Sequence, residues 1–232
     1  MSPIALLSVS DKTDLIPLAQ ALINELGFKI ISSGGTAKLL ESANLPVTRV
    51  ADYTGFPEIL EGRVKTLNPK IHGGILARRD KQNHLEDLKE QNINPIDLVV
   101  VNLYPFEQTI SKENVTWEEA IENIDIGGPT IIRAAAKNHK DVLVVTHPSQ
   151  YPNLIDAFKS KKITDELRKN YSQQAFEHTA IYDLTISKWI ANKISANKTS
   201  WLQSLPLKQK LRYGENPHQK ASWYGKTNEG WS

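Results

Sequence analysis

The chain has 232 residues, of which 28 are Lys or Arg and 26 are Asp or Glu, so its formal net charge is only +2. A charge so close to neutral argues against a general nucleic-acid surface or a polybasic membrane surface, and any anion site must therefore be local. The length allows one sizeable core, or one domain and part of a second. The absence of cysteine excludes disulfides, cysteine-zinc sites and thiolate catalysis, and it suits a reducing cytoplasm.

Several familiar signals are missing from the sequence. The first residues have no cationic leader and only a short apolar run, so we expect no signal peptide. No stretch approaches the ~20 apolar residues of a membrane span. The six histidines include no His-x-x-x-His pair and no carboxylate cluster surrounds them, so we expect no metal site. The Gly-x-Gly-x-x-Gly fingerprint and the Walker A loop are also absent, which argues against dinucleotide and ATP sites.

Short aliphatic runs recur along the first two thirds of the chain and predict buried strands at residues 4–9, 28–31, 47–50, 98–103 and 142–146. The more polar segments between them predict helices at residues 13–26, 36–43, 84–91 and 117–124. This alternation predicts an α/β fold, with a twisted and mainly parallel sheet that has helices on both faces.

After Pro148 the pattern predicts additional C-terminal helices only. Over residues 171–194, Phe176, Ala180 and Leu184 fall on one stripe, with Trp189 and Ile190 near it, which indicates a long helix packed on the core. From about residue 199 the chain becomes polar and richer in Pro and Gly. We therefore expect one domain over residues 1–198, followed over residues 199–232 by a linker and a piece too short to fold alone.

Residues 62–74 have the composition of a site. Arg63, Lys65, Thr66 and Lys70 offer strong hydrogen-bond donors in a stretch that glycines frame. Such donors favour an anionic ligand, although Lys and Arg in a loop are often merely solvated.

Two early turns from strand to helix also suit an anion. The first contains Ser10 and Lys12, and the second runs through Ser33-Gly34-Gly35-Thr36. In a parallel sheet such turns meet at the carboxyl ends of the strands, where helix N-termini offer free N–H groups. Helix capping by Ser10, Asp11 or Thr36 is the structural alternative. Both turns taken together with Arg63, Lys65 and Thr66 favour a phosphate site.

Two later segments carry further polar groups. Asn102 and Tyr104 follow the fourth strand with period-two spacing, so both can point into a cleft, although Tyr104 could instead be buried. Asp125 precedes Gly127-Gly128-Pro129, which predicts a helix start with Pro129 in the first turn and Lys137 about two turns along. A helix cap at Asp125 and a solvated charge at Lys137 are the alternatives.

Together these segments resemble the inosine monophosphate (IMP) cyclohydrolase domain of the bifunctional purine-biosynthesis family that also carries AICAR transformylase. The resemblance covers nearly the whole chain and rests on the order of its motifs, namely Ser8-Val9-Ser10-Asp11-Lys12, Ser33-Gly34-Gly35-Thr36, Thr54-Gly55-Phe56-Pro57-Glu58, Gly62-Arg63-Val64-Lys65-Thr66-Leu67, Asn102-Leu103-Tyr104-Pro105-Phe106, Asp125-Ile126-Gly127-Gly128 and Arg133-Ala134-Ala135-Ala136-Lys137-Asn138-His139. It implies a methylglyoxal-synthase-like α/β fold and a cytoplasmic enzyme that closes the ring of formyl-AICAR ribonucleotide (FAICAR) to IMP with loss of water. It calls for no metal and no cofactor.

The resemblance also implies roles for single residues. The catalytic group would be Lys65, Tyr104, Asp125 and Lys137. Asp125 would take the amide proton, Lys137 would stabilise and protonate the formyl oxygen, and the pair Lys65 and Tyr104 would orient and relay. The residues implied to hold the phosphate are Ser10, Lys12, Ser33, Gly34, Gly35, Thr36, Arg63 and Thr66. Asn102, Gly127 and Gly128 would approach the base and the ribose.

The segment 211–219 resembles the opening of the family's transformylase domain, where Arg212 and Tyr213 would contact AICAR nucleotide. The Lys-His-x-Asn-Pro motif of formyl transfer is absent, so we expect no formyl transfer from these residues, and 10-formyltetrahydrofolate would serve only the missing domain. The full-length protein is expected to be a homodimer that binds neither nucleic acid nor membranes. Two other functions would fit some of the same motifs. The chain could be a methylglyoxal synthase, or a regulatory nucleotide-binding module, which could dispense with Asp125 and Lys137.

Overall fold

The computed structural model describes residues 2–194, 205, 207–212, 216 and 218–225. The chain divides into two compact units, Met1–Asp183 and Leu184–Ser232. The predicted domain boundary at residue 198 lies outside the described residues, so it stays a prediction. In the second unit, β6 (Leu207–Leu211) and β7 (Ala221–Tyr224) form a two-stranded antiparallel sheet with an irregularity between Leu207 and Gln209.

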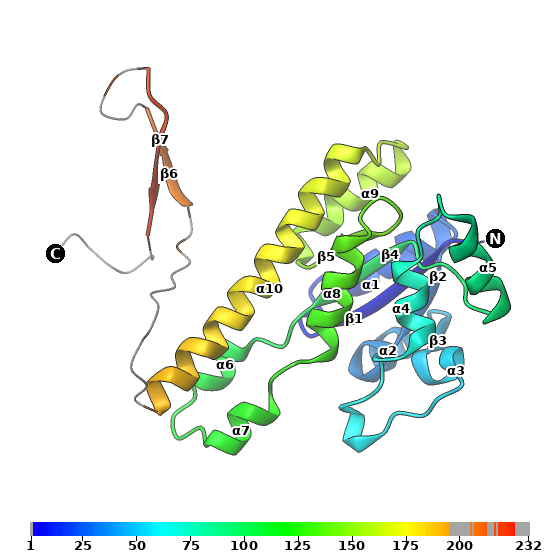
Figure 1. The fold of residues 1–232 in the computed structure, drawn as a ribbon, viewed down its shortest axis with the longest axis horizontal. Coiled ribbons are helices and arrows are strands. Elements are labelled where there is room, and N and C mark those ends of the chain that lie inside the picture. Colours follow the sequence, from blue (N-terminus) through cyan, green and yellow to red (C-terminus); the bar gives the residue numbers. More distant parts are fainter. Residues whose placement is uncertain (1, 195–204, 206, 213–215, 217, 226–232) are drawn as a thin grey trace. The chain divides into compact units, whose positions relative to one another are not determined.

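The first unit contains a five-stranded sheet in which every pair of neighbouring strands is parallel (Figure 1). The strands are β1 (Ile4–Val9), β2 (Lys29–Ser32), β3 (Val47–Arg49), β4 (Leu98–Asn102) and β5 (Leu143–Val145), in the order β3-β2-β1-β4-β5. All five predicted strands and the predicted α/β fold are therefore confirmed. The central strand β1 and its neighbour β4 are buried over nearly their whole length, as expected for a parallel sheet covered on both faces.

Helices follow the strands in the alternation that the sequence predicts. They are α1 (Leu15–Gln20) with the π-helix η1 (Ala21–Glu25), α2 (Gly34–Ser42), α3 (Val50–Thr54), the 3₁₀ turn η2 (Leu60–Gly62), α4 (Pro69–Leu76), α5 (Gln82–Glu90), α6 (Phe106–Ile110), α7 (Trp117–Glu122), α8 (Gly127–Lys137), the 3₁₀ turn η3 (Pro148–Gln150), α9 (Tyr151–Lys159) and α10 (Asp165–Lys193). The helices predicted from the sequence correspond to α1 with η1, α2, α5, α7, α8 and α10.

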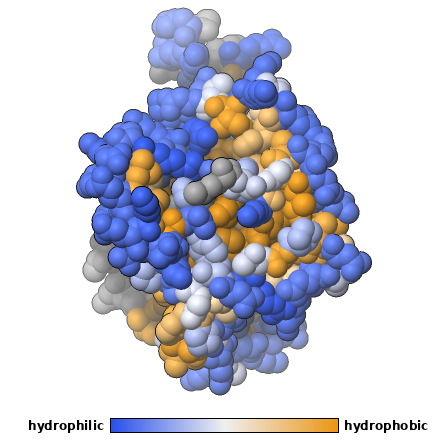
Figure 2. All heavy atoms as spheres, turned by 90° about the vertical axis from the view of Figure 1, so that its right-hand side faces the viewer, coloured by the Kyte–Doolittle hydropathy of each residue, from blue (hydrophilic) through white to orange (hydrophobic). Residues whose placement is uncertain are grey.

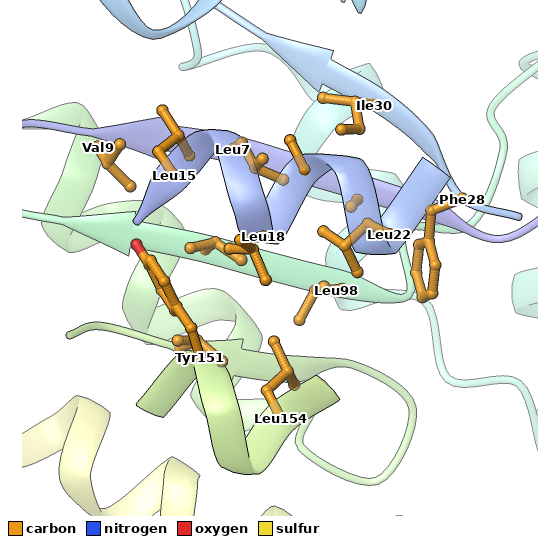
Figure 3. Close-up of a cluster of buried hydrophobic side chains, with 14 of the residues drawn as sticks. Leu7, Val9, Leu15, Leu18, Leu22, Phe28, Ile30, Leu98, Tyr151 and Leu154 are labelled. Carbon is orange, nitrogen blue, oxygen red and sulfur yellow. The ribbon is translucent and has the colours of Figure 1, made fainter. Parts of the chain in front are cut away.

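A hydrophobic core between the sheet and its helices holds β1 and α1 in place. Leu7 of β1, Leu15 and Leu18 of α1 and Leu98 of β4 belong to one buried cluster (Figure 3). Tyr151 at the start of α9 joins the cluster, and burial together with the nearby carboxylates of Asp11 and Asp14 raises the pKa of its hydroxyl to about 12. This cluster holds β1 against α1 and so fixes the two ends of the loop between them.

The buried stripe of α10 differs from the predicted one. Up to Asp183, the buried side chains include Tyr171, Ala175, Thr179 and Tyr182, whereas Phe176 is 38% exposed and Ala180 is also exposed. The prediction followed the most apolar residues, but the side of α10 that packs against α8 uses small and hydroxyl-bearing side chains. Ser172, for example, donates to the carbonyl of Ala136 on α8 at 2.8 Å.

Hydrophilic residues cover much of the face drawn in Figure 2, and hydrophobic residues show in a broad area from its centre to its right side and in smaller areas elsewhere. The exposed large hydrophobic residues of the first unit include Phe56, Leu60, Trp117 and Ile126. In the described part of the chain, every helix is too short or too polar to traverse a lipid bilayer.

Candidate functional site

A cleft of about 860 Å³ opens at the carboxyl ends of β1, β2 and β4. Its walls come from the loops that follow these strands, from residues 61–66 and from residues 121–131. The cleft gathers most of the residues that the sequence analysis proposed as a site, namely Ser10, Lys12, Ser33, Gly34, Gly35, Thr36, Arg63, Lys65, Thr66, Asn102, Tyr104, Asp125, Gly127 and Gly128. Residues far apart in the sequence meet here because a parallel sheet brings the ends of its strands to one edge.

The N-terminus of α2 forms one wall of the cleft. Ser33 is extended with φ −136°, and Gly34 has φ +53°, a left-handed conformation that favours glycine. No side chain among the described residues caps this helix, so its first N–H groups are free to bind a ligand. The hydroxyl of Ser33, a residue only 4% exposed, also has no hydrogen-bond partner in the part of the chain that the structure describes. This wall therefore presents unused donors to an anion.

Two ammonium groups lie beside the same helix end. A Cβ atom added to Gly34 would lie 3.6 Å from Nζ of Lys65, and one added to Gly35 would lie 3.8 Å from Nζ of Lys12. Lys12 is held in place, because its ammonium donates to the carbonyls of Val9 and Ser10 at 3.3 Å each. Two full charges and a helix N-terminus at one point suit a dianionic group such as a phosphate monoester.

Asn102 and Thr36 hold the backbone of this wall. Oδ1 of Asn102 accepts from the N–H groups of Ser10 at 2.7 Å and Asp11 at 2.8 Å, and its Nδ2 donates to the Asp11 carbonyl at 3.2 Å. The Thr36 hydroxyl donates to the carbonyl of Val9 and accepts from its N–H, both at 3.0 Å. Thr36 therefore caps no helix with its side chain, and the polar groups of Asn102 are already engaged in shaping the loop after β1.

Asp125 lies in the same cleft at the start of α8. Its Oδ1 accepts from the N–H of Gly128 at 2.9 Å, so the capping alternative is realised in this structure. A Cβ atom on Gly128 would come within 2.4 Å of Oδ2 of Asp125 and 2.7 Å of Cδ2 of Leu103, and one on Gly127 would come within 2.8 Å of the Thr66 hydroxyl. Only glycine at both positions lets the carboxylate and Thr66 approach the helix this closely.

Tyr104 is 54% exposed and lines the cleft, so the alternative of a buried tyrosine is wrong. Tyr104 follows Asn102, the last residue of β4, by two positions. Tyr104, Lys65 and Asp125 thus share one cleft, although they come from three separate loops.

Arg63 is paired with a residue that the sequence analysis missed. Its guanidinium forms an ion pair with Glu122, the last residue of α7, and its Nε lies 3.0 Å from Oε1 of that carboxylate. The pair raises the pKa of Arg63 and lowers that of Glu122, so both stay charged. Glu61 and Glu122 line the cleft as well. No motif marks either residue, since the fold alone brings α7 to the loop of Arg63.

One predicted catalytic residue of the first unit, Lys137, does not line the cleft. Lys137 is exposed and is the last residue of α8, about 15 Å along the helix axis from Gly127. The residues that line the cleft do not include it, and the expected two turns are nearly three. Its exposure fits the alternative of a solvated charge, and a catalytic role for Lys137 stays a prediction. Arg212 is exposed in the second unit, and Tyr213 lies outside the described residues.

Comparisons with known proteins agree with this arrangement. The model of the MGS-like domain matches residues 14–130, and that of the AICARFT/IMPCHase bienzyme matches residues 135–232. The chain is 86% identical over 232 residues to the bifunctional purine biosynthesis protein PurH of Prochlorococcus marinus (strain NATL1A) and 58% identical over 233 residues to that of Synechococcus sp. (strain CC9902). All of the chain is covered in both cases, but it spans only 45% of each relative's length.

Among solved structures, the chain is similar to that described as the crystal structure of ForH. The TM-score is 0.71 and the sequence identity is 34%, over 81% of this chain and 98% of that one. The matches to the MGS-like domain, to ForH and to PurH proteins along the whole sequence lead to one assignment. The chain belongs to the PurH family and contains an MGS-like domain.

Proposed function

We propose that this chain is an IMP cyclohydrolase, which closes the ring of FAICAR to give IMP and water. One observation carries the proposal: a single cleft holds a helix N-terminus that no described side chain caps, flanked by the ammonium groups of Lys12 and Lys65, together with the carboxylate of Asp125. The helix N-terminus with its two ammonium groups suits the phosphate of a nucleotide. The carboxylate of Asp125 suits a general base that acts at the opposite end of the nucleotide. A volume of about 860 Å³ is large enough for a ribonucleotide.

The reaction requires a general base and hydrogen-bond donors to the formyl oxygen. The carboxamide nitrogen is a poor nucleophile and must lose a proton as it attacks the formyl carbon. Asp125 takes that proton in our mechanism. Negative charge then develops on the formyl oxygen, where donors lower the barrier, and this oxygen leaves as water after it has been protonated. Lys65 and Tyr104 are the donors that share the cleft with Asp125. The attack is intramolecular, so holding the nucleotide in place supplies much of the rate.

This mechanism differs from the sequence-based one in two roles. Lys137 has no part in it, because this residue lies at the far end of α8 in the chain described here, and Lys65 and Tyr104 take over its role as donors to the formyl oxygen. A catalytic Lys137 would need an arrangement other than that of this single chain. The mechanism uses no metal and no cofactor, and 10-formyltetrahydrofolate would be needed only for formyl transfer. That the full-length protein is a cytoplasmic homodimer stays a prediction.

A direct assay tests the proposed function. The purified protein is mixed with FAICAR in buffer without added metal or folate, and IMP is followed by its absorbance and by chromatography. We expect IMP to form at a rate proportional to the protein concentration. A rate equal to that of FAICAR alone would refute the proposal.

We call the N-terminus of α2 together with Lys12 and Lys65 the phosphate seat, and its proposed role leads to a separate prediction about binding. Lys12→Ala should weaken IMP binding by about tenfold or more, because it removes one of the two charges beside the α2 N-terminus. The same substitution should leave the weak binding of inosine, which lacks the phosphate, unchanged. Calorimetric titration of both ligands with the wild type and the variant measures the difference. Equal losses for IMP and inosine would show that the phosphate binds elsewhere.

A further inference from the structure

Asp125 is held at two points, of which only the first belongs to α8. Its carboxylate accepts from the N–H of Gly128, as described above. Its own backbone N–H donates to the hydroxyl of Tyr182 at 2.8 Å. Tyr182 belongs to α10 and lies 57 residues further along the chain. The segment that carries the proposed base is therefore attached to a long helix outside the cleft.

Tyr182 also contacts the segment that carries Tyr104. The ring of Tyr182 packs edge-on against that of Phe106, with centroids 6.4 Å apart and planes at 73°. Phe106 is the first residue of α6 and follows Tyr104 by two positions. Tyr182 itself is only 8% exposed, and its burial raises the pKa of its hydroxyl, which is therefore neutral when it accepts from Asp125.

We propose that Tyr182 is a positioning residue for the ring closure proposed above, acting through the backbone of Asp125. Tyr182 does not line the cleft, so it acts through Asp125 and not on the substrate. Without the hydroxyl, the partly buried N–H of Asp125 would have to turn toward water, because an unpaired buried donor is costly. The carboxylate would turn with it, and a small misplacement of a catalytic group slows a reaction strongly.

The test compares two tyrosines of the same helix. Tyr182→Phe keeps the ring and its packing on Phe106 but removes the hydroxyl. Tyr171→Phe is the matched control: Tyr171 is 3% exposed, and its hydroxyl accepts from Nδ2 of Asn153 at 3.0 Å, away from the cleft. We expect Tyr182→Phe to lower kcat by roughly ten- to hundredfold with KM unchanged, since the phosphate seat is intact. Tyr171→Phe should leave both constants at wild-type values.

A second readout does not depend on catalysis. Amide hydrogen exchange at Asp125, measured by NMR, should become faster in Tyr182→Phe and stay unchanged in Tyr171→Phe. The proposal is overturned by a wild-type kcat in Tyr182→Phe, by equal losses in the two variants, or by unchanged exchange at Asp125. If the wild type itself makes no IMP, the proposed function fails, and the exchange measurement alone then decides whether Tyr182 holds this amide.

Discussion

Asp125→Asn should lower kcat for ring closure by about two to four orders of magnitude, because an amide cannot take the proton that the carboxamide nitrogen must lose. The side chain keeps its shape, and its remaining oxygen can still accept from the N–H of Gly128, so the start of α8 should be preserved. IMP should therefore bind with nearly wild-type affinity. Turnover of FAICAR and titration with IMP measure the two effects separately.

Asp165→Asn is the matched control for this experiment. Asp165 is an exposed carboxylate in the first turn of α10, where it pairs with Lys169, and it lies outside the cleft. The same chemical change there should leave turnover unaltered. Turnover by Asp125→Asn at the rate of the control would remove Asp125 from the mechanism.

Lys65→Ala should lower kcat/KM by about a hundredfold, or ~3 kcal/mol, with kcat itself reduced. The ammonium of Lys65 lies beside Gly34 and shares the cleft with Tyr104 and Asp125, so it can act on charge at either end of the nucleotide. A loss confined to KM would mean that Lys65 serves only the phosphate.

Lys38→Ala provides the comparison for Lys65→Ala. Lys38 is exposed on the same helix whose N-terminus forms the phosphate seat, but it does not line the cleft. Its removal should leave both kinetic constants unchanged. An equal loss in the two variants would show that Lys65 contributes only to the general charge of this unit.

The fold and most of the cleft could be predicted because both depend on signals that are local in the sequence. Each strand is a short aliphatic run, and a parallel sheet brings the polar residues after such runs to one edge, which is why Ser33 and Asn102 meet in the cleft. Gly127-Gly128-Pro129 likewise predicted the start of a helix, and α8 begins at Gly127.

What could not be predicted depends on orientation and on long-range contacts. The motif that contains Lys137 shows that a lysine follows three alanines, but not that the length of α8 carries it away from Asp125. The ion pair of Arg63 with Glu122 and the hydrogen bond from Asp125 to Tyr182 each join segments more than fifty residues apart. The periodicity of α10 favoured Phe176, since apolar character says nothing about which side of a helix needs small side chains.

The hydrogen bonds of Asn102 to the loop after β1 bear on when this site comes into being as the protein folds. They join residues 91 and 92 positions apart, and β1 is next to β4 in the sheet, so the loop has its final shape only after the chain between these strands has been enclosed. Contacts of such separation form late because closing a long loop costs entropy. Intermediates without β4 would have no preshaped phosphate seat. A nucleotide would then stabilise the finished domain alone, slowing its unfolding and leaving the early steps of folding unaffected.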